Sequence, residues 1–528
     1  MLIQLKSFVN KINSAKYYLL AVNIILVGAL IMLANFGILP FKKMSDFIFF
    51  AGIGFIFALY RPGWSFLFFI GTIALENINL APKELGVAIR PYQFLGFLTF
   101  VAVGVRYYSR RLNFKLPKFR WTEYLIILLV LGGFLGSLNA LNGGIALKQS
   151  IIILSFGLLY FLVRVFIQNL DDIKRIIPFF LSSSTVIIIY GIWQNWQFMR
   201  GKNNFEVMAG RTNATFTEAD WFGIFLVFLL SILYVVVYNL YSKIKIFELE
   251  RRRVAFAQVL FSGFLIILSW IALIITVSRS AWLGVAVITL GVLSYWILKK
   301  KVKLILIILA SILIAFASVY FLKLTNFQLD NRIQSTTSGQ QKITIACGGE
   351  VQIPGPIDDI TQLKQYGCEH INLEDIKKEQ STGRVIKEIY RKDPNVSIRA
   401  KIYKKSWNEI KNHPIFGIGW GNIADILGKD ERGTGLNSSN IFLEVWLGAG
   451  IIGLLSFAGL VGYILGRGKW FFLKKLKEGK FFREDSEMDF FCLFLILSAT
   501  AIIVPNLFNA GIMLGFLWAW MGIVMVRE

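Results

Sequence analysis

The chain has 528 residues, of which 56% are hydrophobic and 17% are charged. Soluble domains usually contain about 45–50% apolar and about 25% charged residues, so this composition is typical of a lipid-embedded protein. Apolar runs of membrane-spanning length recur up to the C-terminus, which excludes a secreted soluble enzyme. The net charge of +24 lies in short clusters between these runs, and this arrangement argues against a nucleic-acid partner.

Runs of roughly 20 apolar residues, long enough to cross about 30 Å of hydrocarbon, predict an all-α polytopic bundle with about 12–14 spans. The clearest spans are expected at residues 17–39, 91–107, 121–140, 145–167, 176–196, 221–241, 254–277, 281–298, 304–322 and 440–466. The stretch 488–526 predicts two more, broken near Pro505. The stretch 46–76 predicts two short helices around Arg61-Pro62-Gly63, or one broken hairpin.

Four Lys/Arg clusters, which begin at Arg106, Lys243, Lys299 and Arg467, fall on one side of this bundle. Cytoplasmic loops are enriched in Lys and Arg, so that side and both termini are expected in the cytoplasm. The polar segment 323–439 then forms an extracytoplasmic loop domain between two membrane domains, 1–322 and 440–528. Within this segment, 360–366, 373–380 and 402–412 are expected to be helical, and 339–355 to be a loop or short hairpin.

Two of the three cysteines, Cys347 and Cys368, share this outer segment. Disulfides persist outside the cytoplasm, so a bridge between them is expected, with two unpaired thiols as the alternative. No Cys/His spacing typical of a metal site is present in the sequence, and no metal or cofactor is expected.

Polar residues at membrane depth are costly and therefore point to function. Arg279 stands between two apolar runs, flanked by Ser278 and Ser280, and is expected at the outer membrane boundary. A guanidinium there could bind a phosphate through two hydrogen bonds. The alternative is an arginine in a tight turn that contacts lipid headgroups. Arg211 lies in a short outer loop and is a second candidate, or a solvated residue whose acidic neighbours cap the next helix.

Two polar motifs follow in the outer segment and at the entrance to the next span. In the first, His413-Pro414 precedes three glycines at alternate positions, Gly417, Gly419 and Gly421, which permit close backbone approach to a partner. The pattern lacks the Lys-Ser/Thr of a phosphate-binding loop. In the second, Ser439, Asn440 and Glu444 stand at the start of the longest predicted span. They could be functional, or Ser439 or Asn440 could simply cap that helix.

Together and in this order, these motifs resemble the O-antigen ligase and O-antigen polymerase family of bacterial membrane glycosyltransferases. The segments that carry the resemblance are 276–284 with its Ser-Arg-Ser, 413–421 with its His-Pro-x-Phe-Gly-x-Gly-x-Gly, and 440–453 with its Asn-x-aromatic-Leu-Glu. The resemblance covers about residues 210–453 and includes the large outer loop before the last helices.

The resemblance implies glycan transfer from an undecaprenyl-diphosphate carrier to an acceptor hydroxyl on the outer face of the bacterial cytoplasmic (inner) membrane. The acceptor would be a lipid A-core sugar in lipopolysaccharide for a ligase, or another carrier-linked repeat for a polymerase of cell-envelope polysaccharide. Family members use no nucleotide and no metal. By position, Arg211 and Arg279 correspond to the arginines that bind the diphosphate, and Arg399 to a further loop arginine.

One position departs from the family pattern. Ligases commonly carry a His before the Asn that opens the last motif, and Ser439 stands there in this chain. A hydroxyl is a poor general base without help, which leaves His413, His370 or Glu444 to activate the acceptor. The alternative function is a transporter or flippase for a lipid-linked sugar, although no inverted repeat is evident in the sequence.

Overall fold

The computed structural model describes residues 2–203, 205–206, 210–244, 249–324, 329, 334–335, 338–358, 360–371, 375–392, 394–428, 435–481 and 485–526. The chain is a polytopic helical membrane protein, as the apolar runs predicted. Its N-terminal half contains α1 (Leu2–Asn35), α2 (Met44–Tyr60), α3 (Pro62–Thr72), η1 (Lys83–Leu85), α4 (Pro91–Tyr108), α5 (Trp121–Leu138), α6 (Gly143–Phe166), α7 (Leu170–Met199), α8 (Ala219–Ile244), α9 (Leu249–Ile275), α10 (Arg279–Leu298) and α11 (Val302–Phe321).

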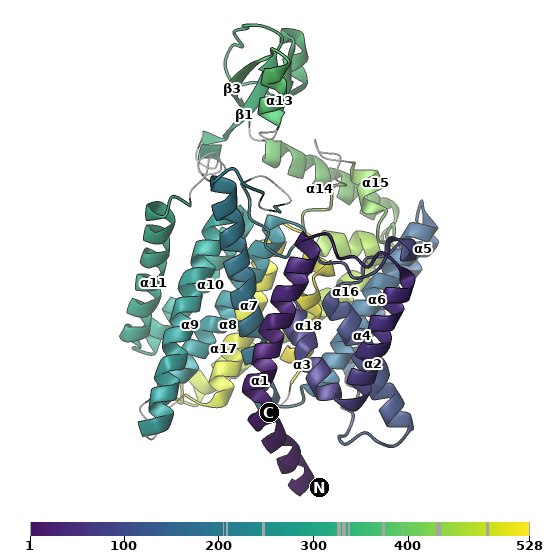
Figure 1. Cartoon of the computed structure of the whole chain (residues 1–528), viewed down its shortest axis with the longest axis vertical. Coiled ribbons are helices and arrows are strands. Elements are labelled where there is room, and N and C mark those ends of the chain that lie inside the picture. Colours follow the sequence, from purple (N-terminus) through teal and green to yellow (C-terminus); the bar gives the residue numbers. More distant parts are fainter. Residues whose placement is uncertain are drawn as a thin grey trace.

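The C-terminal half adds a small sheet and further helices. These elements are β1 (Gln340–Cys347), η2 (Ile360–Tyr366), β2 (Cys368–His370), α13 (Ile376–Ser381), β3 (Val385–Lys392), α14 (Pro394–Asn412), α15 (Ile423–Leu427), α16 (Ile441–Lys477), α17 (Glu487–Asn506), η4 (Gly511–Met513) and α18 (Gly515–Val524). Figure 1 shows the sheet standing apart from the bundle, at the end opposite both chain termini.

Among the described residues, ten helices are long and apolar enough to cross a membrane: α1, α5 to α11, α16 and α17. The apolar helices α2 and α18 are shorter, and α4, expected as a span, is not among the ten. The predicted number of spans is therefore reached only if these shorter or more polar helices also cross.

Helix α8 is enclosed by other parts of the protein. In its most apolar stretch 89% of the residues are buried, against 28% in α11, which lies at the edge of the bundle (Figure 1). Its phenylalanines pack on rings from other helices, for example Phe228 against Phe516 of α18 with centroids 5.3 Å apart. Residues at the start of α8 therefore belong to the most buried of these ten helices.

The two uncertain regions resolve into separate helices. α2 and α3 meet at Arg61, and Pro62 opens α3, a position where the missing N–H costs nothing. At the C-terminal end α17 finishes at Asn506 with Pro505 in its last turn, and α18 starts after a short irregular segment. The prediction of two short helices at 46–76 and that of a break near Pro505 are both confirmed.

The polar segment contains a three-stranded antiparallel sheet with β1 in the middle, in the order β2-β1-β3. Cys347 of β1 is opposite Cys368 of β2, and a disulfide joins these two residues. Ile343 and Ile345 of β1 pack with Leu363 in a small apolar core. The prediction of a loop or hairpin at 339–355 was wrong for β1, because its partner strands come from distant parts of the sequence.

The helices expected in this polar segment are found with some changes. The stretch 360–366 is the 3-10 helix η2, and 402–412 is the C-terminal part of α14. Of the stretch 373–380, residues 373 and 374 lie outside the described residues, and the helix α13 covers Ile376–Ser381.

Candidate functional site

Arg211 is held by two hydrogen bonds just before the buried helix α8. Its guanidinium is buried, with the residue 6% exposed. Nε donates to the carbonyl of Thr276 at 3.3 Å, and Nη2 forms an ion pair with Asp220 at 3.0 Å. Nη1 has no hydrogen bond within the part of the chain that the structure describes. The side chain is therefore oriented by two of its three nitrogens.

The turn between α9 and α10 has strained backbone. Val277 has φ of +54°, in the left-handed region that β-branched residues rarely adopt. On either side of it, the carbonyl of Thr276 accepts from Arg211, and Ser278 Oγ donates to Asp220 Oδ1 at 2.6 Å. Strain of this kind is typical of functional sites, where the surrounding contacts maintain it.

Arg279 is the first residue of α10 and is half-buried. Asp220 bonds both to Arg211 and to Ser278, the residue before Arg279. The structure therefore brings the Arg211 loop and the start of α10 together around one carboxylate. We call the group Arg211, Asp220, Ser278, Arg279 and Ser280 the arginine cluster.

A segment near the C-terminus connects the arginine cluster to the start of α16. Asn509 Nδ2 donates to Ser280 Oγ at 2.8 Å, and Asn440 Nδ2 donates to the carbonyl of Leu507 at 3.2 Å. Between them, the ring of Phe508 lies 5.6 Å from the guanidinium of Arg399. The segment 507–509 thus links three elements that carry predicted site residues. Sequence reasoning missed it, although two asparagines after Pro505 interrupt an otherwise apolar stretch.

At the start of α16, the predicted motif caps the helix. Asn440 Oδ1 accepts from the backbone N–H groups of Phe442 and Leu443. Glu444 Oε2 accepts from the backbone N–H of Ser438 at 2.9 Å. Ser439 adopts φ of +51°, and its carbonyl accepts from the hydroxyl of Tyr403 in α14. Capping does not exclude a second role for Glu444, because this residue is half-buried.

The glycines of the segment 413–421 allow close packing against neighbouring helices. Gly417, Gly419 and Gly421 all have positive φ, from +70° to +85°. Ile418 N–H donates to the carbonyl of Leu447 at 2.7 Å, so this loop runs against α16 as a backbone-to-backbone contact. A Cβ on Gly417 would collide with that same carbonyl. Gly417 is therefore needed for close approach to α16, whereas a Cβ on Gly419 or Gly421 would meet residues of the α5–α6 region, such as Ala146 and Ile145.

Helix α16 bends to receive this loop. Gly450, inside the helix, has φ of +64° and ψ of −168°, which breaks the helical path. The N–H of Ile451 donates instead to the carbonyls of Pro414 and Ile415 in the loop. His413, just before, has an exposed side chain with no hydrogen bond in the described part of the chain. Among the described residues, the structure shows no contact between His413 and the arginine cluster.

The loop between α3 and α4 contains a buried acid, Glu76, and contacts the Arg211 segment. Glu76 accepts from the hydroxyl of Tyr92 at 2.9 Å and from the N–H of Gly515 at 2.6 Å, and it pairs with Arg90 at 3.0 Å. Burial raises the pKa of Glu76 above its usual range, although the Arg90 guanidinium opposes this shift. The next residue, Asn77, donates through its N–H to the carbonyl of Thr215. This network was not predicted, and it is joined to the Arg211 loop by that hydrogen bond.

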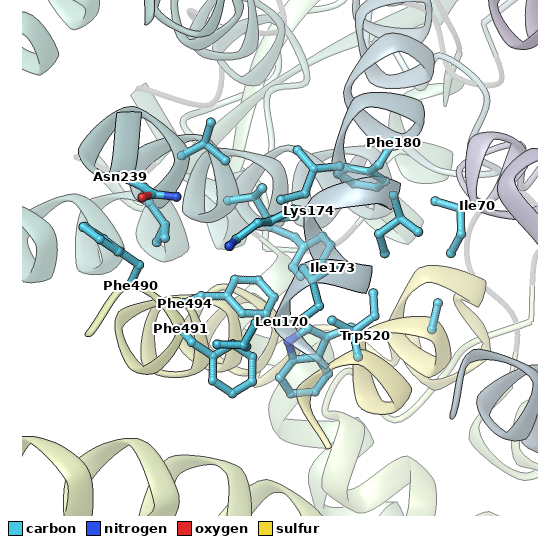
Figure 2. Close-up of a pocket in the computed structure, with 18 of the residues that line it drawn as sticks. Ile70, Leu170, Ile173, Lys174, Phe180, Asn239, Phe490, Phe491, Phe494 and Trp520 are labelled. Atoms are coloured by element: carbon cyan, nitrogen blue, oxygen red, sulfur yellow. The ribbon is translucent and has the colours of Figure 1, made fainter. Parts of the chain in front are cut away.

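Figure 2 shows a pocket that lies elsewhere, between α7, α8, α17 and α18. Its volume is about 130 Å³, and its lining is almost wholly apolar except for Lys174, Asn239 and Glu487. Along α8, Asn239 follows Asp220 by nineteen residues, which corresponds to about 29 Å of helix. The pocket is therefore distinct from the arginine cluster. Among the described residues, no group of His, Cys, Asp and Glu could hold a metal ion.

A family model described as O-antigen ligase matches residues 264–458. The matched segment runs from α9 into α16 and includes Arg279, Arg399, His413 and Glu444, whereas Arg211 and the segment 507–509 lie outside it. No curated protein matches the chain. The resemblance that the motifs predicted is confirmed over this segment: residues 264–458 of this polytopic helical membrane protein are similar to the O-antigen ligase family.

Proposed function

We propose that this protein transfers a glycan from an undecaprenyl-diphosphate carrier to an acceptor hydroxyl, at the outer face of the cytoplasmic membrane. The observation that carries the proposal is the arginine cluster, in which Asp220 ties Arg211 to the start of the helix that Arg279 opens. Arg279 directly follows Ser278, and two guanidiniums acting together would suit a diphosphate, because each offers paired N–H donors with a planar geometry.

In this mechanism the bond between the anomeric carbon and the phosphate oxygen breaks, and the diphosphate leaves with the electron pair. Arg211 and Arg279 stabilise the charge that develops on it, more strongly in a partly dry site than water would. The acceptor oxygen forms the new bond to the anomeric carbon and gives its proton to a base. We assign Arg399 to the same diphosphate as a further cation.

The acceptor side is assigned to the start of α16. Asn440 bonds to the segment 507–509, which also contacts Ser280, so this helix end lies next to the arginine cluster along a short path. Glu444 is the favoured base there, with Ser439 as a hydrogen-bonding partner of the acceptor and His413 as the alternative base. The Cys347–Cys368 disulfide supports an extracytoplasmic position for the segment 323–439, because disulfides persist outside the cytoplasm.

The test uses purified protein in detergent with a synthetic carrier-linked glycan and a soluble acceptor sugar. Wild type is expected to form a new glycosidic bond and to release carrier diphosphate, detected by mass spectrometry. Arg211→Ala and Arg279→Ala should abolish product while expression is retained, and Lys at either position should rescue poorly because it lacks the planar fork. Movement of labelled carrier across liposomes without bond formation would instead identify a transporter.

A further inference from the structure

The segment 507–509 is held at both ends by parts of the proposed site. The carbonyl of Leu507 accepts from Asn440 on the acceptor side, and Asn509 donates to Ser280 in the arginine cluster. Successive Cα atoms are about 3.8 Å apart, so Phe508 stands one residue away from each tether. Its backbone therefore lies between the tether to the arginine cluster and the tether to the helix end that would receive the acceptor.

The side chain of Phe508 is only partly covered by the protein. The residue is half-buried and does not belong to the apolar core of the bundle. Its described ring contact is the guanidinium of Arg399, 5.6 Å from the ring centroid. An aromatic ring near a membrane boundary can also serve as an interface anchor, and the test must separate that role from a binding role.

We propose that Phe508 is the platform on which the transferred sugar ring stacks. This inference rests on the proposed function and adds a contact to the sugar. A pyranose has apolar faces of C–H groups, which favour the electron-rich face of an aromatic ring, and it would stack on the face of Phe508 that Arg399 does not cover. Stacking there would hold the anomeric carbon between diphosphate and acceptor without any covalent role for Phe508.

The test compares the binding of two ligands to purified protein: undecaprenyl diphosphate with a single sugar attached, and the same carrier without sugar. Phe508→Leu is expected to weaken binding of the sugar-linked carrier by about two- to tenfold, the usual range for an aromatic contact. Binding of the sugar-free carrier should stay at the wild-type value, and Phe508→Trp should bind both ligands like wild type. The matched control is Phe36→Leu, an aromatic side chain 70% exposed after the end of α1, which should change neither affinity.

Equal losses for both ligands would overturn the inference, because the ring would then act on the diphosphate through Arg399. Unchanged binding of the sugar-linked carrier in Phe508→Leu would overturn it as well. If Phe508→Leu unfolds at a lower temperature than wild type, Phe508→Met provides the same test with a flexible side chain. Failure of the proposed function is recognised separately, since wild type itself would then form no glycosidic bond.

Discussion

At the scale of single residues, Asp220 is the side chain on which the arrangement of the arginine cluster depends. Asp220→Asn removes the negative charge and one acceptor oxygen. The side chain can then no longer accept hydrogen bonds from both Arg211 and Ser278. Losing a charge-assisted hydrogen bond costs about 1.5–3 kcal/mol, which predicts a roughly 10- to 100-fold lower kcat/KM for glycan transfer. Steady-state kinetics with the purified variant checks this value.

The matched control for that variant is Asp171→Asn. Asp171 lies in the first turn of α7, its side chain is 73% exposed, and it pairs with Lys174 beside the apolar pocket. This variant should keep wild-type kinetics. A wild-type kcat/KM in Asp220→Asn would contradict the prediction, because glycan transfer would then not depend on the ion pair between Asp220 and Arg211.

The sequence pointed to Arg279 as a candidate, because a charged residue between two apolar runs stands out at membrane depth, and to Arg211 through the family resemblance. It could not show their anchors. The contact between Ser278 and Asp220 spans 58 residues and that between Asn509 and Ser280 spans 229, and neither leaves a local pattern. The same reason explains why Phe508 was not predicted.

At the scale of elements, the bent helix α16 and the glycine loop form one unit. A Cβ on Gly450 would collide with the carbonyl of Ile415, and the positive φ adds a strain of roughly 1–2 kcal/mol for any other residue. Gly450→Ala is therefore predicted to destabilise the protein by more than about 2 kcal/mol. The melting temperature of the solubilised variant, followed by intrinsic fluorescence, measures the loss.

Gly462→Ala is the control for this variant, since Gly462 lies on the same helix and a Cβ added there would meet no atom within 4 Å. It should be neutral or slightly stabilising, because Ala favours a helix over Gly by about 1 kcal/mol. A Gly450→Ala variant that melts with wild type would mean that α16 does not need its bend.

Helices could be predicted better than strands for a physical reason. A membrane helix closes its own hydrogen bonds, so a run of apolar residues is enough to identify it. β1 pairs with β2 and with β3, which come later in the chain, and its alternating residues Lys342 to Ala346 are few and only partly apolar. The bend at Gly450 was not predicted either, because it depends on hydrogen bonds to a loop more than thirty residues earlier in the chain.

At the scale of the whole molecule, the disulfide and the bundle should behave as separate stability units. The bridge joins residues 21 positions apart, for which the chain-entropy model gives roughly 3 kcal/mol of stabilisation. The double variant Cys347→Ser, Cys368→Ser is predicted to make the segment 340–392 sensitive to protease while the melting temperature of the bundle is kept. Limited proteolysis with mass spectrometry checks the first effect, and equal loss of the bundle would contradict the prediction.

The central claim is that Arg211 and Arg279 grip one diphosphate together. The most direct measurement is the ratio of affinities for undecaprenyl diphosphate and undecaprenyl monophosphate, in wild type and in each Arg→Ala variant. Wild type is predicted to prefer the diphosphate by roughly 10- to 100-fold, the worth of one charge-assisted contact, and either variant should lose most of that preference. A ratio near one in wild type, or an unchanged ratio in both variants, would contradict the claim.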